Sequence, residues 1–130
     1  MIVLDTHAWI WLIKEPLRLG RAARKEIERA ERIIISTISC YEVAWLERRG
    51  RVRLDRATDA WIARASVEAG ARPEEVSTEI AVKAAQLDQQ RFPGDPADRI
   101  IYATAVHHRA KLITRDAAIA RFDPERAVWD

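Results

Sequence analysis

The stretch that decides the fold is MIVLDTHAWIWLI, residues 1–13. Residues 2–4 form a short continuous apolar run that is typical of a buried strand, and the apolar pattern resumes at Ala8. Asp5 stands between these two segments. Burying an unpaired carboxylate costs several kcal/mol. Asp5 must therefore cap a helix, pair with another group or hold a cation, and Thr6 is the better-placed cap for the helix that follows.

Short apolar segments alternate with helical patterns along the rest of the chain. Expected strands lie at 33–35, 75–77, 111–114 and 127–129. Expected helices lie at 21–32, 39–49, 58–69, 78–87 and 97–110, with loops at 16–20 and 92–96. Continuous apolar strands that alternate with helices predict a parallel sheet covered on both faces. The expected fold class is α/β, with three α/β/α layers around a central parallel sheet.

Length and composition narrow the class of protein. A chain of 130 residues with 48% hydrophobic and 32% charged residues fits one globular domain spanning residues 1–130. Cys40 is the single cysteine, which excludes a disulfide framework and multi-cysteine zinc sites. The opening apolar segment is too short to span a bilayer, so we expect no membrane association and a cytoplasmic location.

The charge balance gives a weak indication of the partner. The formal net charge is +2 and the sequence pI is about 9.0, and most of the 22 basic residues are arginines. Arginine binds phosphate in a bidentate manner, which suits a nucleic-acid partner. The 20 acidic residues offset this charge, so most arginines are expected on solvated helix faces.

Four acids are expected at the carboxyl edge of the predicted sheet, where open α/β sheets bind their ligands. Asp5 and Asp116 each follow a predicted strand directly. Glu42 and Asp98 each lie in the first turn of a helix that follows a strand or loop. The topology therefore predicts that these four carboxylates lie close together.

Each acid taken alone also has a structural interpretation as a helix cap. Ser39 and Glu42 match a capping box, with Ser39 as the N-cap. Asp95, Pro96 and Asp98 match an N-cap, a first helical residue and an acid favoured by the helix dipole. Asp116 can cap a short turn over residues 117–120.

Caps explain the four acids less well as a group. Gathered carboxylates repel one another and raise one another's pKa unless a cation lies between them. Oxygen ligands without a cysteine or histidine set favour a hard ion, Mg²⁺ or Mn²⁺. Such an ion beside a phosphate would polarise the phosphoryl oxygen and activate a water. The pattern predicts hydrolysis of a phosphodiester.

Four ordered segments carry a resemblance to a known family: MIVLDTHAWIW (1–11), STISCYEVAWL (36–46), DPADRIIYATA (95–105) and KLITRD (111–116). Together they span nearly the whole chain. The chain resembles PIN-domain ribonucleases, and most of all the VapC toxins of bacterial toxin–antitoxin pairs.

The resemblance implies a function and a set of site residues. It implies an Mg²⁺- or Mn²⁺-dependent endoribonuclease that acts on RNA, forms a homodimer and is silenced by a VapB-type antitoxin. Asp5, Glu42, Asp98 and Asp116 match the family's acidic quartet. Asp5 and Asp98 match its direct metal ligands, and Glu42 and Asp116 are expected to act in part through water. Thr114 matches a supporting hydroxyl.

Other residues near these motifs have less specific interpretations. Thr6 is expected to support the site as a helix cap. Asp95 is expected to be a cap, with water-mediated metal contact as the alternative. Arg99 is equally consistent with steadying a carboxylate, binding phosphate or forming a surface ion pair. His7 is expected to be structural or to lie behind the metal ligands.

The remaining histidines, Cys40 and the tryptophans have structural interpretations. His107 and His108 are expected to interact with a helix C-terminal dipole, and Cys40 is expected to be a small core residue. The tryptophans at 9, 11, 45 and 61 could stack on bases, but filling the core or lining a protein interface is the preferred interpretation.

Two other functions were weighed against the nuclease. A signalling receiver domain would need an acid pair after the first strand and a lysine at a late strand end, and the chain has DTH and TRD there. A PIN-like module that binds RNA or protein with little catalysis is the remaining alternative. The intact acidic quartet argues against it.

Overall fold

The computed structural model describes all of residues 1–130. Short parallel strands alternate with helices from one end of the chain to the other, and 3₁₀ turns follow α1 and α5. In chain order the elements are β1 (Ile2–Leu4), α1 (Thr6–Lys14), α2 (Arg21–Arg29), β2 (Ile33–Ser36), α3 (Thr37–Arg48), α4 (Thr58–Glu68), β3 (Ala71–Glu74), α5 (Thr78–Gln86), α6 (Pro96–His107), β4 (Lys111–Ile113), α7 (Ala117–Phe122) and β5 (Ala127–Val128).

The strands form one parallel sheet in the order β3-β2-β1-β4-β5. The first strand is the middle one, and Val3 pairs with Ile34 on one side and with Leu112 on the other. Because all strands run the same way, their carboxyl ends meet at one edge. That edge carries the start of α1 after β1, of α3 after β2 and of α7 after β4.

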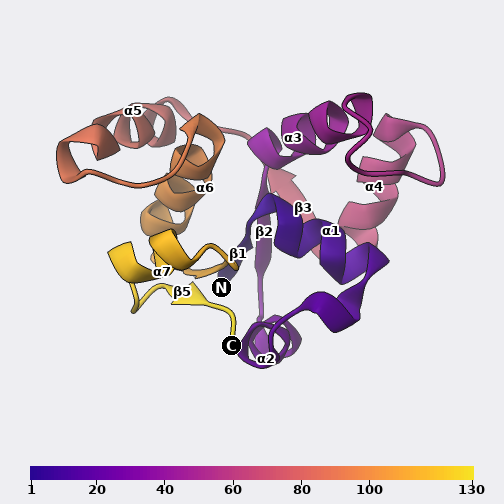
Figure 1. The fold of residues 1–130 in the computed structure, drawn as a ribbon, viewed down its shortest axis with the longest axis horizontal. Coiled ribbons are helices and arrows are strands. Elements are labelled where there is room, and N and C mark those ends of the chain that lie inside the picture. The colour runs from indigo at the N-terminus through magenta and orange to yellow at the C-terminus, as the bar shows by residue number, and fades with distance from the viewer.

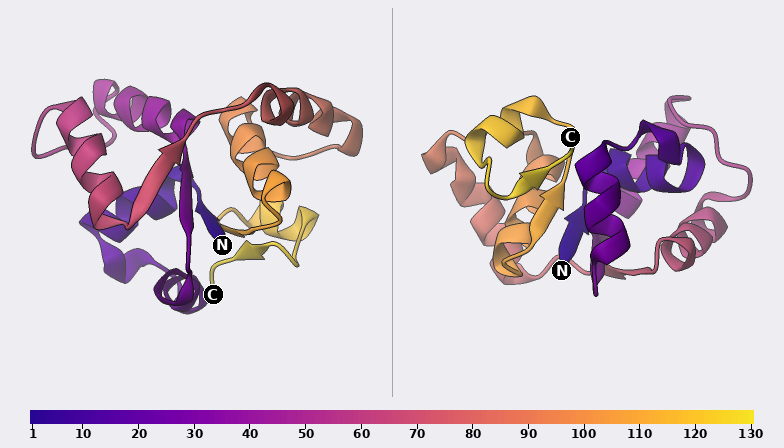
Figure 2. Two further views of the ribbon diagram at one scale, coloured as in Figure 1. Left: turned by 180° about the vertical axis from the view of Figure 1, so that it is seen from behind. Right: turned by 90° about the horizontal axis from the view of Figure 1, so that it is seen from below.

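Helices cover both faces of the sheet (Figure 1). Side chains alternate along β1, so Ile2 and Leu4 enter an apolar cluster under α1, α2 and α4, while Val3 enters a second cluster under α6 and α7. The view from below separates the two helical layers (Figure 2). The predicted three-layer α/β/α fold with a central parallel sheet is confirmed.

Two of the tryptophans belong to the first cluster. Trp9 and Trp61 are buried with ring centroids 5.7 Å apart, and the Trp9 indole N–H donates to the Ala65 carbonyl at 3.3 Å. The core interpretation is correct for these two. Trp45 is 40% exposed on α3 beside Arg49, so for this residue the interface interpretation stays a prediction. Cys40 is half-buried against the cluster.

The third strand lies earlier than the sequence predicts. It spans Ala71–Glu74 and pairs with β2, and the predicted segment 75–77 instead leads into α5. The sheet ends at this strand, and its sequence ARPE contains a proline and charges rather than an apolar run. An edge strand tolerates proline because one side of its backbone needs no partner. The apolar signal that marks a central strand is therefore absent.

The third helix begins two residues before the predicted start. Ser36 is its N-cap, and its hydroxyl accepts a hydrogen bond from the Ile38 N–H at 3.2 Å. The predicted capping box of Ser39 and Glu42 is therefore wrong, and Glu42 lies beyond the first turn. The second helix also ends earlier than predicted, at Arg29.

The C-terminal strand is attached to the start of α2. Gly20 is the N-cap of α2 and has no side chain to satisfy the helix N–H groups. The Trp129 carbonyl accepts the Ala23 N–H at 2.9 Å instead. A Cβ at Gly20 would lie 2.1 Å from that carbonyl oxygen, so only glycine permits the approach. In this way a distant segment supplies the missing helix cap.

The paired histidines at the end of α6 bind acids from other elements. The His108 Nε2 lies 2.5 Å from a carboxylate oxygen of Glu74 on β3, and the His107 Nδ1 lies 3.8 Å from Glu79 on α5. The prediction that they serve the helix dipole is thus incomplete, because these acids are their partners.

No helix is both long and apolar enough to cross a membrane.

Candidate metal and active site

Asp5 is held at the start of α1 by the turn from strand to helix. Its Oδ1 accepts the Ala8 N–H at 2.8 Å, which makes Asp5 the N-cap of α1. The expectation that Thr6 would be the cap is wrong. The cap uses only Oδ1, and Asp5 also accepts a hydrogen bond from Thr114, so capping does not account for the whole side chain.

Thr6 instead connects α1 to α3. Its side chain is buried, and its Oγ1 lies 2.9 Å from the Ser39 Oγ and donates a hydrogen bond to the Glu42 carboxylate. This contact fixes the side chain of Glu42, which is half-buried and lies in the second turn of α3. Thr6 therefore supports the site by a contact that the sequence did not predict.

Asp95 is the N-cap of α6, as predicted, and Asp98 returns a hydrogen bond, so the two acids form a reciprocal capping box. Asp95 Oδ1 accepts the Asp98 N–H at 2.8 Å, and Asp98 Oδ2 accepts the Asp95 N–H at 3.3 Å. Arg99 donates to the Gly94 carbonyl at 3.1 Å and pairs with Asp88. Arg99 therefore stabilises the loop before α6. Of the three interpretations that the sequence left open for this residue, its contacts agree with the ion pair.

Asp116 and Thr114 form a similar turn after β4. Asp116 caps α7, accepting the Ala118 N–H at 2.8 Å and the Ile119 N–H at 3.1 Å through one oxygen, Oδ1. The buried Thr114 hydroxyl accepts the Asp116 N–H at 3.1 Å and also contacts Asp5. Thr114 thus joins the acids that follow β1 and β4.

One hollow of about 480 Å³ brings the predicted acids together. Its lining is Asp5, Thr6, His7, Trp11, Glu42, Asp95, Asp98, Arg115 and Asp116. These residues come from segments that are far apart in the chain and meet at the carboxyl edge of the sheet. Arg99 is not part of the lining.

Burial and mutual repulsion raise the pKa of three of these acids. Burial raises the pKa of Asp5, although hydrogen bonds from Thr114 and Ala8 oppose the change. Burial also raises the pKa of Glu42, against the hydrogen bond from Thr6. Burial and the neighbouring Asp95 carboxylate raise the pKa of Asp98 to about 7. The hollow therefore gathers carboxyl groups whose ionisation the fold opposes.

The donor set fits a hard divalent cation. Apart from the His7 imidazole, the possible ligands in the lining are carboxylate and hydroxyl oxygens, which Mg²⁺ and Mn²⁺ prefer. No three acid, histidine or cysteine side chains are arranged to chelate one ion directly. This arrangement suits an ion that takes one or two carboxylates and keeps several waters.

The hollow also contains residues that the sequence did not single out as site residues. Arg115 lines it beside Asp116, and His7 and Trp11 of α1 also line it, with ring centroids 5.5 Å apart. Their positions in the sequence were the available signal. His7 and Trp11 lie in the same motif as Asp5, and Arg115 directly precedes Asp116. His107 and His108 do not line the hollow.

The fold and the hollow together define an α/β protein with an oxygen-ligand site at the carboxyl edge of a parallel sheet. A family model described as PIN domain matches residues 2–124. The chain belongs to the PIN domain family.

A relative in Mycobacterium tuberculosis, named Ribonuclease VapC22, is 37% identical over 115 residues, which cover 88% of this chain and 86% of the relative. Two solved structures share the fold. VapBC2 from Rickettsia felis, bound to a promoter DNA fragment, has a TM-score of 0.67 at 16% identity and full coverage of both chains. DNA-bound VapBC from Salmonella typhimurium has a TM-score of 0.68 at 19% identity, covering 98% of this chain and 96% of that one.

Proposed function

We propose that this chain is a metal-dependent endoribonuclease and the toxin of a toxin–antitoxin pair. The observation that carries the proposal is the hollow in which Asp5, Glu42, Asp98 and Asp116 converge from distant segments. Membership of the PIN domain family and the likeness to Ribonuclease VapC22 support the nuclease activity. The VapBC structures that share its fold support the toxin role.

The family implies a divalent metal ion, and we propose Mg²⁺ or Mn²⁺. Asp5 and Asp98 would bind it directly, and Glu42 and Asp116 would bind through water. When bound, such an ion supplies an activated water and polarises the phosphoryl oxygen of the substrate.

The chain's own residues prepare this site. Thr6 orients the Glu42 carboxylate, and the capping hydrogen bonds of Asp5 and Asp116 each occupy one carboxylate oxygen. Both capping bonds of Asp116 use Oδ1, so its Oδ2 is available at the hollow. The fixed turns thus orient the carboxylates before substrate binds, which lowers the reorganisation needed during the reaction.

The proposal includes partners and a location. The substrate is RNA, and a VapB-type antitoxin covers the acidic hollow with a basic side chain. The chain acts in the cytoplasm as a homodimer. Charge complementarity between the hollow and a basic antitoxin segment supports the inhibitory contact.

RNA cleavage by the purified chain tests the proposal, with Mg²⁺, Mn²⁺ or EDTA, beside Asp98→Asn and the matched control Glu28→Gln. Glu28 is exposed on α2 and does not line the hollow. We expect cleavage that requires the ion, falls more than about 100-fold in Asp98→Asn and persists in Glu28→Gln. Calorimetric titration with Mn²⁺ should show weaker binding in the same variant.

Equal cleavage in EDTA and in the Asp98 variant would contradict the proposed site. Metal binding without cleavage of any RNA would favour the alternative, a PIN-like module that binds RNA or protein.

A further inference from the structure

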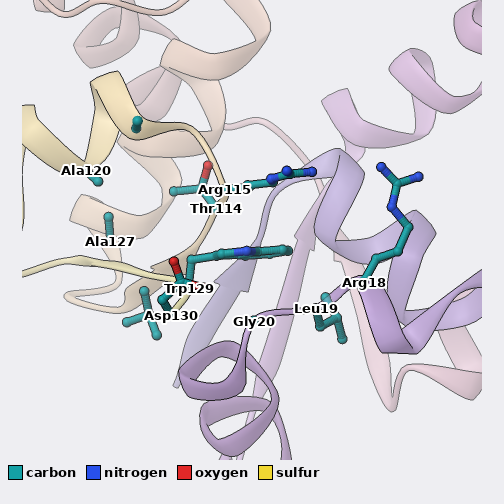
Figure 3. Close-up of a pocket in the computed structure, with 11 residues that line it drawn as sticks. Arg18, Leu19, Gly20, Thr114, Arg115, Ala120, Ala127, Trp129 and Asp130 are labelled. Atoms are coloured by element: carbon teal, nitrogen blue, oxygen red, sulfur yellow. The ribbon is translucent and has the colours of Figure 1, made fainter.

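A second hollow adjoins the acidic one. It has a volume of about 900 Å³ and lies between the loop before α2, the turn after β4 and the C-terminal segment. Arg18, Arg115 and Trp129 contribute its large side chains, and Arg115 also lines the acidic hollow. Figure 3 shows Arg115 and Trp129 extending toward the wall that carries Arg18.

Trp11 connects this hollow to the acids. The Arg18 guanidinium carbon lies 4.3 Å from the centre of the Trp11 ring, and that of Arg115 lies 5.7 Å away. The Trp11 and Trp129 rings meet edge to face at 5.7 Å. Two arginines and two indoles therefore form one continuous surface beside the carboxylates.

The arginines of this surface are available to an anion. Arg115 is exposed and forms no salt bridge, and Arg18 has only the exposed Glu15 at 3.1 Å. An exposed pair of this kind is weak. Trp11 and Arg18 also line a third hollow with Lys14, Arg51 and Arg53, which extends the basic surface.

The tryptophans are held rigidly enough to serve as a stacking surface. Both are half-buried against the first apolar cluster. The backbone of the C-terminal segment is fixed by the bond from Ala23 to the Trp129 carbonyl and by the Thr114 N–H, which donates to the Val128 carbonyl at 3.2 Å. A rigid aromatic face stacks on a base at little entropic cost.

We propose that Trp11, Arg18, Arg115 and Trp129 form the binding subsite for the nucleotide next to the scissile phosphate of single-stranded RNA. The inference rests on the ribonuclease function proposed above. Arg115 lies between the two hollows and binds the phosphate that adjoins the scissile one. The indoles stack on the base of the nucleotide that carries this phosphate. Unpaired strands expose bases for such contacts, whereas a duplex keeps them stacked. These are positioning residues rather than catalytic ones.

Binding of a fluorescein-labelled single-stranded RNA of about 12 nucleotides tests the subsite. The background is Asp98→Asn, so that the probe stays intact, and anisotropy is measured over a range of salt concentrations. Arg115→Ala and Arg18→Ala are compared with Arg29→Ala, which removes an exposed arginine of α2 outside every hollow described here.

We expect Arg115→Ala to weaken binding several-fold and to lower the salt slope by about 0.7, the value for one phosphate contact on a single strand. Trp129→Leu should weaken binding about tenfold while keeping the slope, and should lose the preference for intact RNA over an abasic probe. Arg115→Lys should keep the salt slope, which would show that the contact depends on the positive charge of the side chain. Thermal melting establishes that each variant is folded.

The subsite proposal is overturned if the Arg18, Arg115 and Trp129 variants all bind RNA as Arg29→Ala does. Unchanged RNA affinity with weakened antitoxin binding would also overturn it and assign the surface to a protein. Cleavage by the parent chain is measured separately. If the parent does not cleave RNA but the variants lose RNA affinity, the ribonuclease proposal fails. The surface of Trp11, Arg18, Arg115 and Trp129 is then an RNA-binding site without cleavage.

Discussion

Asp95 and Asp98 each accept the other's backbone N–H, at 2.8 and 3.3 Å, so one capping box orients both carboxylates at the acidic hollow. The exposed Asp95 carboxylate also opposes ionisation of the half-buried Asp98, because like charges repel. Burial, and next the neighbouring Asp95 carboxylate at the start of α6, raise the pKa of Asp98 to about 7.

Without a bound ion, folding stability should fall as the pH rises from about 4 to 7. The pKa values of Asp5, Glu42 and Asp98 are raised in the folded chain, so the folded state binds more protons than the unfolded state in this range. The associated stability is fully present below the unfolded-state pKa and is lost as Asp98 ionises near pH 7. Thermal melts in EDTA at a series of pH values measure it.

Asp98→Asn should reduce this loss. The amide carries no charge, so the variant in EDTA at pH 8 should melt about 3 °C higher than the parent, a gain of roughly 1 kcal/mol. Added Mg²⁺ or Mn²⁺ should stabilise the parent and shift the variant much less. A variant that melts lower than the parent, with Glu28→Gln unchanged, would show that the Asp98 charge stabilises the fold.

Asp5 has a structural role as the cap of α1 and a proposed role as a metal ligand, and two substitutions can separate them. Asn keeps an oxygen that accepts the Ala8 N–H, whereas Ala removes the cap. We expect Asp5→Asn to fold at least as stably as the parent in EDTA and Asp5→Ala to be less stable than Asp5→Asn by about 1 kcal/mol. Both should lose metal-dependent cleavage. Urea unfolding measures the first difference, and retained cleavage in Asp5→Asn would remove Asp5 from the metal ligands.

The sequence predicted the layers and the position of the acids because both depend on local signals. Apolar runs at residues 2–4, 33–35 and 112–113 identify central strands, and acids that follow strands in a parallel sheet must meet at one edge. The edge strand Ala71–Glu74 was missed because its pattern contains proline and charges. Its pairing is a property of the folded sheet.

The contacts that the sequence could not predict are those between distant segments. The bond from Thr6 to Glu42 requires α1 and α3 to pack, and the cap that Trp129 supplies to α2 requires β5 to close the sheet. Arg115 was not singled out from the sequence, because nothing local indicates that Trp11 lies beside it. Side chains that are chemically ordinary in sequence thus become part of the site through packing.

The hydroxyl of Thr6 should tune the ionisation of Glu42. Its hydrogen bond lowers the pKa of that carboxyl against the effect of burial. Thr6→Val should therefore raise the pKa of Glu42 further and move the acid limb of the cleavage profile to higher pH, while Thr6→Ser should keep the parent profile. NMR titration of the Glu42 side chain measures the pKa directly. An equal shift in Thr6→Ser would point to packing of the threonine methyl group instead.

Gly20→Ala should detach the C-terminal segment from α2. The new Cβ would lie 2.1 Å from the Trp129 carbonyl oxygen and 2.9 Å from its indole Cδ1, so the backbone of this segment must move. Displacing it removes the cap on the Ala23 N–H, and we expect a loss of about 2–3 kcal/mol by urea unfolding. Faster hydrogen exchange at Thr114, which bonds to Val128, would locate the change.

Gly50→Ala is the matched control for this substitution. Gly50 has a φ of +69° and nothing within 4 Å of a Cβ, so alanine there suffers only the cost of the left-handed conformation, about 1 kcal/mol. Gly20 has an extended φ of −64°, which any residue adopts, so its cost arises from the contact with Trp129 alone. If Gly20→Ala costs no more than Gly50→Ala and leaves Thr114 protected, the C-terminal segment does not depend on this approach.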